Sequence, residues 1–334
     1  MTGATRAPHG RTDFAARFVV RAAMTAPSMH NTQPWSFASS RDVISVYADP
    51  VRALPHTDPA GREIVISGGA ALFNLRLAMH HLGFASQAQL LPQTGRLDHL
   101  ADVRWGRYSR PTAYDELLYR AMTRRRTHHG RFSTAPVPAA LITELVRLVY
   151  EERATLHVVS GTEEIRTLAE LVRKAEMAQR AELGIATERA RWTAAAGGGR
   201  RTDGMAARAA DRTASGPAFA DRQYGPDPQW PTALPHNRAN VHGLGVVVVL
   251  ATQEDRPLDW LRAGQVLQRL LLHATAHHVS AAFHTQPLEL PDYRRRIQAE
   301  FAAGAYPQLL LRLGHADHDP KTPRRPVTDA LREH

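Results

Sequence analysis

Apolar residues recur along this chain at two spacings, one typical of helices and one typical of strands. Phe14, Phe18, Val19 and Ala22 fall on one helical face and predict a helix over 11–25. The same periodicity predicts further helices over 64–84, 113–126, 136–153, 163–183 and 260–278. The helix over 64–84 is apolar on most sides, so it is expected to be buried.

Shorter segments between these helices have the composition of strands. The segment DVISVYAD at 42–49 alternates two sets of side chains, and β-branched residues occur in both. Further strands are predicted at 87–92, 100–107, 154–160, 245–251 and 306–315. Helices and strands together predict an α+β fold.

Two of the predicted helices resemble each other. Each follows a strand and precedes another, and aligning them superposes small and apolar residues: Gly69 on Gly264, Leu72 on Leu267, Leu75 on Leu270 and Leu77 on Leu272. Leucines at helical spacing are common, so chance is one explanation. The other is that the chain contains two copies of one α+β unit, packed as a pseudo-dimer.

Length and composition limit the possible classes of protein. A chain of 334 residues with 43% hydrophobic and 22% charged residues is globular and forms one large domain or two smaller ones. The absence of cysteine excludes disulfides, thiolate metal sites, Fe–S clusters and a cysteine nucleophile. The first 18 residues lack the apolar core of a secretory signal, and no apolar run approaches about 20 residues. The expected location is the cytoplasm, without membrane contact.

The formal charge of +10 comes mostly from arginine. Nucleic-acid binding is one interpretation, but the arginines are spread along the chain and aromatic residues for base stacking are missing. Attraction of anionic small molecules by a basic cleft is the favoured one.

Histidine pairs and a Gly-rich stretch are two further candidates for functional sites. The chain has 18 histidines, and three pairs are adjacent, at 80–81, 128–129 and 277–278. Adjacent side chains on a helix point apart, unlike the i, i+4 pair of a zinc site, so no metal site is expected. The Gly-rich stretch near 197 lacks the GK[ST] ending of a phosphate-binding P-loop, and no GxSxG elbow occurs.

The segment 193–240 differs from the rest. It is rich in Gly, Pro and Ala and has little periodicity. Long loops inside compact proteins are usually functional or disordered, so this segment is predicted to be a cover, or lid, over a site.

A polar turn at 25–37, TAPSMHNTQPWSF, resembles the APSxxNxQPW motif of the nitroreductase superfamily of FMN-dependent oxidoreductases. RRRTHHGRF at 124–132 is similar to the phosphate-binding motif of that superfamily. Further matching pieces follow in order over most of the chain, and they resemble the Acg-like, flavin-sequestering branch. The region 193–240 matches only by its position.

The resemblance implies a nitroreductase-like fold. Ordinary nitroreductases bind FMN between two subunits, one giving the Ser/Asn turn and the other the Arg-rich motif. Here both motifs lie in one chain. The resemblance therefore implies two tandem halves, 11–110 and 111–334, that form an intramolecular pseudo-dimer with one retained flavin site and a lid at about 193–240.

The resemblance also implies which residues bind the cofactor. The turn would serve the pyrimidine edge of the ring or the ribityl hydroxyls, and Gln33 could instead bond to the backbone and hold the turn. Two arginine pairs and a threonine would hold the phosphate, and the segment at 284–291 would pass the reactive side of the ring. The implied residues are Pro27, Ser28, Met29, Asn31, Gln33, Arg125, Arg126, Thr127, Thr285, Gln286, Arg324 and Arg325.

Each of these residues also has an alternative interpretation in which it binds no ligand. A Ser/Asn turn without a ligand and solvated surface arginines are the alternatives for the two motifs. Trp35 is expected in the core, and Arg62 and Glu63 are expected to form an ion pair that holds their loop. No side chain is assigned as a catalytic acid or base.

The function expected first is that of an FMN oxidoreductase, in which NAD(P)H reduces the flavin and a small-molecule acceptor takes the electrons. The alternative is a flavoprotein that stores or sequesters FMN with little reductase activity. A basic protein associated with nucleic acid is a third interpretation. The chain is expected to be a monomeric pseudo-dimer or a homodimer.

Overall fold

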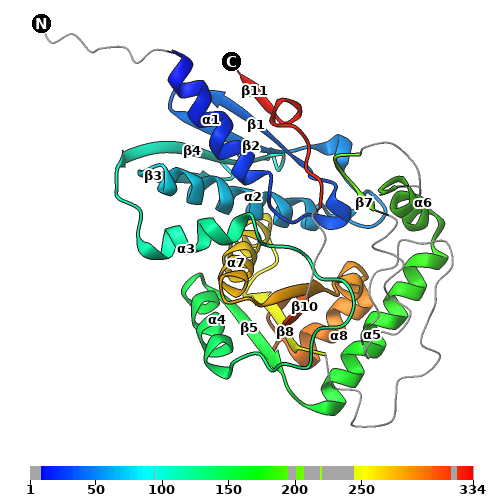
Figure 1. Cartoon of the computed structure of the whole chain (residues 1–334). Coiled ribbons are helices and arrows are strands. Elements are labelled where there is room, and N and C mark those ends of the chain that lie inside the picture. Colours follow the sequence, from blue (N-terminus) through cyan, green and yellow to red (C-terminus); the bar gives the residue numbers. More distant parts are fainter. Residues whose placement is uncertain are drawn as a thin grey trace, which may run out of the picture.

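The computed structural model consists of two α+β units, one above the other in Figure 1. Long helices from both units lie between the two sheets. The structure describes residues 9–93, 95–194, 201–206, 219, 244–316 and 322–333.

The first unit contains a sheet with the strand order β11-β1-β2-β4-β3. The last strand of the chain, β11 (Leu331–Glu333), returns to this sheet and pairs in parallel with β1, with Leu331 opposite Phe37. The other elements, in chain order, are α1 (His9–Ala23), η1 (Met29–Asn31), β1 (Trp35–Ser40), β2 (Val43–Ala48), η2 (Pro50–Arg52), α2 (Arg62–His81), β3 (Phe84–Leu90), β4 (His99–Tyr108) and α3 (Ala113–Met122).

The second unit contains a sheet with the strand order β5-β8-β10-β9. Its elements include two helices, α5 and α6, that form an arm reaching the first unit, where the Glu188 carboxylate accepts bonds from the backbone and hydroxyl of Thr57. The elements are α4 (Ala139–Glu151), β5 (Ala154–Val159), α5 (Thr162–Ala181), α6 (Leu183–Arg191), β6 (Thr193–Ala194), β7 (Met205–Ala206), β8 (Val246–Thr252), α7 (Pro257–Ala276), β9 (Ser280–Phe283), η5 (Gln286–Glu289), α8 (Pro291–Phe301) and β10 (Tyr306–Gly314). After them, η6 (Val327–Asp329) packs with α1 and β11 in the first unit.

The two units have the same topology. In each, two strands are followed by a helix of 20 residues and then by two more strands. In each sheet the order of these four strands is first, second, fourth, third, and every neighbouring pair among them is antiparallel. The weak helix repeat in the sequence therefore coincides with a repeat of the whole strand and helix arrangement.

The helices α2 and α7 pack closely, and glycines make this possible. A Cβ atom on Gly69 would lie 3.0 Å from Cα of Gly264, and one on Gly264 would lie 2.9 Å from Cα of Gly69. Each Cβ would also collide with a backbone carbonyl of the other helix, that of Leu261 or Ile66. Only glycine on both sides lets the two backbones approach this closely.

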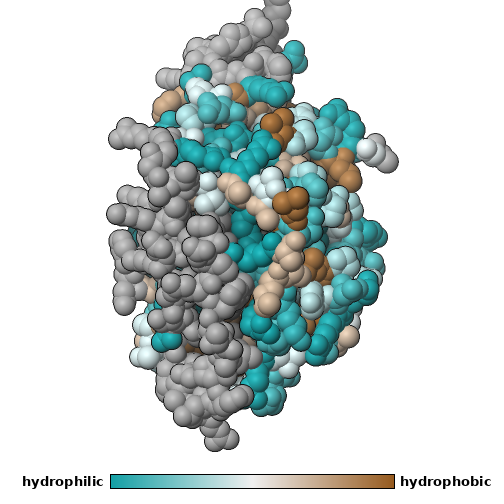
Figure 2. All heavy atoms as spheres, turned by 90° about the vertical axis from the view of Figure 1, so that its right-hand side faces the viewer, coloured by the Kyte–Doolittle hydropathy of each residue, from teal (hydrophilic) through white to brown (hydrophobic). Residues whose placement is uncertain are grey.

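The core continues through this helix pair. Trp35 is fully buried, as expected, and packs with α1 and α2 residues in the core of the first unit. A second cluster joins α4 and α7 to the strands β5, β8 and β10. On the face in Figure 2, apolar side chains of the described residues form small separate patches among hydrophilic ones.

Most predicted helices and strands are present, with ends shifted by a few residues. The helix predicted over 113–126 ends at Met122, because the chain then turns to bring Thr127 beside Ala281 in a parallel bridge. The sequence analysis did not identify β1, β9, β11, α6 or α8. Within the described residues, no helix combines the length and apolar character needed to span a membrane.

Two predictions about larger segments are tested little by the structure. Of the expected lid at 193–240, only 193–194, 201–206 and 219 belong to the described residues, and the remainder lies outside them. The division at residue 110 separates the two sheets except for β11, which lies with the first unit.

Candidate functional site

A cavity lies between the two units, where α2 and α7 meet the turn at 27–31. It contains about 880 Å³ of empty space, a volume that includes open solvent at its mouth. Eight of the residues proposed from the sequence line it: Pro27, Ser28, Met29, Asn31, Arg125, Thr127, Thr285 and Arg324.

The turn that forms one wall has an unusual backbone. His30, Asn31 and Gln33 have φ values of 48°, 53° and 52°, in the left-handed region that non-glycine residues seldom adopt. The Ser28 hydroxyl accepts a bond of 3.0 Å from the backbone N–H of Gln33 and closes the turn. Several such residues in one turn cost roughly 1 kcal/mol or more each, and such strain clusters at binding sites.

Asn31 connects three segments that are distant in the sequence. Its amide nitrogen donates to the carbonyls of Gly204 (3.0 Å) and Pro323 (3.2 Å), and its amide oxygen accepts from Arg324 (3.0 Å). The Gly204 N–H donates back to the Asn31 carbonyl at 3.1 Å. These bonds hold the segment 201–206 over the turn, and Met205 lines the cavity.

Gln33 and Arg325 lie behind the cavity wall. The Gln33 amide donates to the Thr202 carbonyl at 2.8 Å and accepts from the backbone N–H of Arg325 at 3.0 Å. The Arg325 guanidinium donates to the carbonyls of Gln33 and Trp35. Both residues are buried and hold the turn against the C-terminal segment, which is the second role considered for Gln33.

Arg125 and Arg324 bring positive charge to the cavity wall. Arg324 donates to the carbonyls of Thr25 (3.2 Å) and Ala26 (3.1 Å), and Arg125 donates to Thr25 at 3.4 Å. Burial, with a smaller effect of the charge on Arg126, lowers the pKa of Arg324 to about 10.

No carboxylate among the described residues bonds to Arg324, and its Nε atom is buried without a hydrogen-bond partner there. Even partial burial of a charge without a counter-charge is costly, so this wall favours an anion.

Arg126 and Gln286 do not line the cavity. The Arg126 guanidinium donates to the carbonyls of Thr123 and Arg125, which closes the end of α3. Gln286 is fully buried in η5, where its carbonyl accepts from Gln179. Neither polar atom of the Gln286 side chain has a hydrogen-bond partner among the described residues. Its neighbour Thr285 does line the cavity and donates its hydroxyl to Glu289 at 3.2 Å.

The cavity also has residues that the sequence analysis did not identify. Four of these ten residues come from α2 and α7, which cross at this point, and no motif marks the inward faces of the two helices. The apolar ones offer a surface for a flat, uncharged group: Ile66, Met205, Leu267, Phe283 and Leu309. The polar ones are His30, Glu63, Ser67, His129 and Thr322.

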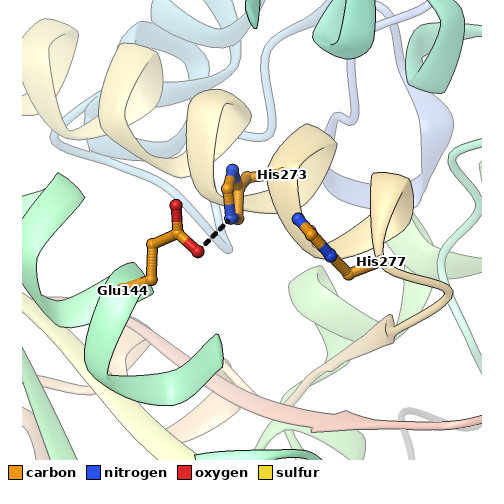
Figure 3. Close-up of side chains that lie close together, drawn as sticks. All are labelled: Glu144, His273 and His277. Carbon is orange, nitrogen blue, oxygen red and sulfur yellow. Dashed lines mark ion pairs between the residues drawn. The ribbon is translucent and has the colours of Figure 1, made fainter. Parts of the chain in front are cut away.

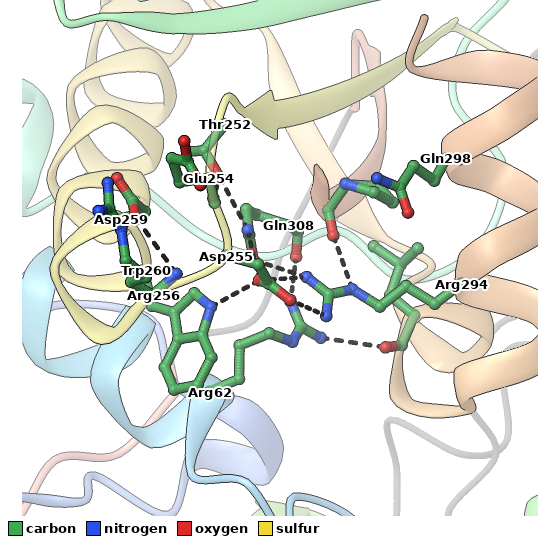
Figure 4. Close-up of polar contacts among 12 residues, drawn as sticks. Arg62, Thr252, Glu254, Asp255, Arg256, Asp259, Trp260, Arg294, Gln298 and Gln308 are labelled. Carbon is green, nitrogen blue, oxygen red and sulfur yellow. Dashed lines mark hydrogen bonds and ion pairs between the residues drawn. The ribbon is translucent and has the colours of Figure 1, made fainter. Parts of the chain in front are cut away.

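Arg62 and Glu63 form the expected ion pair, at 2.5 Å, and both side chains are buried. Glu63 lines the first cavity and also a second one beyond it. Behind the pair, Arg62 donates to the backbone carbonyl of Gln308 at 2.8 Å, as part of the polar network in Figure 4. The pair thus forms a fixed polar partition between the two cavities.

Two carboxyl groups near this partition have pKa values shifted in opposite directions. Burial opposes ionisation of Asp255, but bonds from Arg294, Trp260 and Gln308 outweigh it and hold the Asp255 pKa at about 2 (Figure 4). Burial dominates at Asp58 and raises its pKa to about 6, although it accepts a bond from the Ile64 N–H. Asp58 therefore titrates near neutral pH at the start of α2.

Comparisons with known proteins match nearly the whole chain. "Putative NAD(P)H nitroreductase Rv3131" of Mycobacterium tuberculosis is 30% identical over 94% of this chain and 90% of its own length. "Putative NAD(P)H nitroreductase acg" of the same organism is 27% identical over 93% of each chain. No family model matches.

Solved structures overlap with part of the chain. The crystal structure of the FMN-dependent nitroreductase NfnB from Mycobacterium smegmatis, in complex with NADPH, covers 65% of this chain and 97% of its own. The sequence identity is 17% and the TM-score is 0.40.

Proposed function

Because this chain belongs to the nitroreductase superfamily, we propose that it is an FMN-binding oxidoreductase in which NAD(P)H serves as the electron donor and a small molecule as the acceptor. Its Mycobacterium tuberculosis relatives carry the name of NAD(P)H nitroreductases, and NfnB is described as FMN-dependent and was crystallised with NADPH. For this chain, the proposal that it binds FMN rests on the residues that line its own cavity.

The observation that carries the proposal is Arg324. Its half-buried guanidinium lines the cavity, and no described carboxylate neutralises it. A phosphate group would supply the missing charge and accept charge-assisted hydrogen bonds. The residues present therefore fit the anionic end of FMN.

The other parts of the cavity fit the other parts of the same cofactor. Arg125 and Thr127 lie on the wall with Arg324 and would hold the phosphate with it. Ser28 and Asn31 would serve the ribityl chain or the pyrimidine edge. The apolar surface formed by α2, α7, β9 and β10 would contact the flat ring.

The residues of this chain bind, orient and shield, and the redox chemistry belongs to the cofactor. Bound FMN supplies a centre that accepts hydride from a nicotinamide and passes electrons to an acceptor. The hydrogen bonds of Asn31 and Gln33 fix the turn that positions the cofactor. The segment 201–206 excludes water from one side through Met205. No side chain is required as a proton donor.

Storage of FMN is a second candidate function, and the segment 201–206 favours it. This segment is bonded to the turn through Gly204 and Thr202, and Arg52 adds an ion pair to Asp203 at 2.9 Å. A cover held by so many contacts limits access to the cavity. A protein built in this way could sequester FMN and turn it over slowly.

The repeated topology supports the proposal that the chain is an intramolecular pseudo-dimer. Each unit contributes one long helix to the crossing at Gly69 and Gly264, and the cavity lies beside this crossing. The turn comes from the first unit, and Thr285 and Leu309 come from the second. One chain therefore supplies both sides of one flavin site, and a monomer is sufficient for binding.

An anaerobic titration separates the two candidate functions. FMN-reconstituted protein is mixed with NADPH, then with NADH, and the absorption band of oxidised flavin is followed. Prompt bleaching by stoichiometric donor is the expected result for a reductase. A band that persists in excess donor would identify a storage protein instead.

A further inference from the structure

Three side chains with metal-binding groups meet on the second unit, away from the candidate flavin cavity. Glu144 projects from α4, His273 projects from the last turn of α7, and His277 projects from the C-cap position that follows this helix (Figure 3). One ligand atom from each lies within 4.8 Å of those of the other two. None of the three lines the candidate cavity.

The separations suit a small cation. The Nε2 atom of His273 lies 3.3 Å from a carboxylate oxygen of Glu144, and the rings of His273 and His277 have centroids 4.8 Å apart. Ligand atoms bound at about 2.0–2.1 Å in a tetrahedral zinc site lie about 3.4 Å from one another. The first pair already has this spacing, and His277 is exposed, so its side chain has room to turn inward.

The surroundings of His273 prepare its Nε2 atom for a metal. The Tyr114 hydroxyl lies 3.3 Å from Nδ1, where its oxygen can accept a hydrogen bond from Nδ1–H in the tautomer that leaves the Nε2 lone pair available. His273 is 2% exposed, so the surrounding residues hold its ring in a fixed position.

The spacing of the two histidines on α7 is i, i+4, which places both on one face of the helix. The sequence analysis considered only adjacent histidines, so it did not identify this pair. The partner Glu144 could not be found from the sequence, because it lies more than a hundred residues earlier and only the packing of α4 on α7 brings it close.

We propose that Glu144, His273 and His277 form a zinc site, with water as the fourth ligand. Two imidazoles and one carboxylate are a common ligand set for zinc. The site would join α4 to the C-terminal end of α7, and zinc would thus stabilise the second unit. It is independent of the proposed flavin chemistry.

Calorimetric titration of ZnCl₂ into untagged, EDTA-treated and dialysed protein tests the site. The wild-type protein is expected to bind one zinc ion with a dissociation constant in the micromolar range or below. Glu144→Gln and His277→Ala should each weaken this binding at least tenfold. His278→Ala, which removes the neighbouring exposed histidine, is the matched control and should leave it unchanged. Zinc should also raise the melting temperature of the wild type and of the control only.

Identical titrations for wild type, Glu144→Gln and His277→Ala would overturn the proposal, because any zinc bound would then lie at other histidines. Absence of zinc binding in the wild type would overturn it as well. Both substitutions are at partly or fully exposed side chains, and melting curves without zinc establish that the variants fold. As a second measurement, Co²⁺ should give the intense visible absorption of a four-coordinate site in the wild type and not in His277→Ala.

Discussion

At the scale of single residues, membership of a sequence motif does not by itself decide which arginines line the candidate site. All four arginines bond to backbone carbonyls, but only Arg125 and Arg324 line the cavity, and their sequence neighbours Arg126 and Arg325 do not. A pair of adjacent arginines in a motif identifies the neighbourhood of a phosphate site. The backbone conformation at each position decides which of the two arginine side chains faces the cavity. The sequence alone does not give this conformation.

The first prediction concerns Arg324. Replacing it with alanine removes a half-buried cation and the charge-assisted bonds proposed to the phosphate, so FMN affinity should fall about 10- to 100-fold. The affinity for riboflavin, which lacks the phosphate, should change little. Fluorescence titration of both flavins measures this. Arg166→Ala, at an exposed helix position, is the control, and an equal loss for both flavins would contradict the phosphate assignment.

The second prediction concerns Asp58, whose pKa burial raises to about 6 from an ordinary value of 3.8. Since the folded state holds this proton more tightly, the carboxyl contributes stability at low pH that is lost as the pH rises through 6. Asp58→Asn cannot ionise and its amide oxygen still accepts the Ile64 bond. The variant should therefore gain about 1 kcal/mol relative to the wild type between pH 5 and pH 8.

Urea unfolding at a series of pH values measures this difference. The exposed Asp42→Asn provides the control and should show no such trend. A stability difference between Asp58→Asn and wild type that is constant over this range would exclude a buried, titrating Asp58.

At the scale of secondary-structure elements, periodicity predicted the long helices and the apolar strands well. Strong apolar patterns such as that of α7 and β8 determine the element regardless of context. The sequence predicts no strand at β9 (Ser280–Phe283), because its four residues contain too little alternation to be recognised. β11 contains the charged residues Arg332 and Glu333, and only its pairing with β1 makes it a strand.

The third prediction concerns the crossing of α2 and α7. Glycine to alanine in a helix normally stabilises it by up to about 1 kcal/mol. Gly264→Ala should instead lower the free energy of unfolding by about 2 kcal/mol, because the methyl group would meet the backbone of α2 at Ile66 and Gly69. Gly95→Ala, where the added carbon has no neighbour within 4 Å, should lose only the roughly 1 kcal/mol of its left-handed backbone.

Chemical denaturation of the two variants and the wild type measures this. Stabilisation by Gly264→Ala would mean that the helices are not in close contact. FMN affinity gives a second readout, since the cavity lies beside the crossing and a displaced α7 should weaken it.

At the scale of the whole molecule, the two units share one topology and meet at equivalent glycines. The sequence indicated the repeat only through four residue pairs aligned between the two long helices, and chance could also produce such a match. The strand order is much stronger evidence for two copies of one unit, because the same order repeats over four strands and a helix. The return of β11 to the first sheet ties the end of the chain to its beginning, with Arg324 and Arg325 just before it.

The fourth prediction is a stoichiometry. If one chain supplies both sides of a single flavin site, the reconstituted protein should retain one FMN per chain, and this ratio should not depend on oligomeric state. Flavin absorbance with protein quantification gives the ratio, and light scattering gives the mass. Two FMN per chain would show that both halves kept a site, and half an FMN per chain would mean that two chains must combine.

The central claim is that the cavity between the two units holds FMN by its phosphate. The most direct measurement is a side-by-side titration of the wild-type protein with FMN and with riboflavin, followed by flavin fluorescence. We expect saturable binding of FMN in the micromolar range or below, and binding of riboflavin that is at least tenfold weaker. No binding of FMN, or equal affinities for the two flavins, would contradict it.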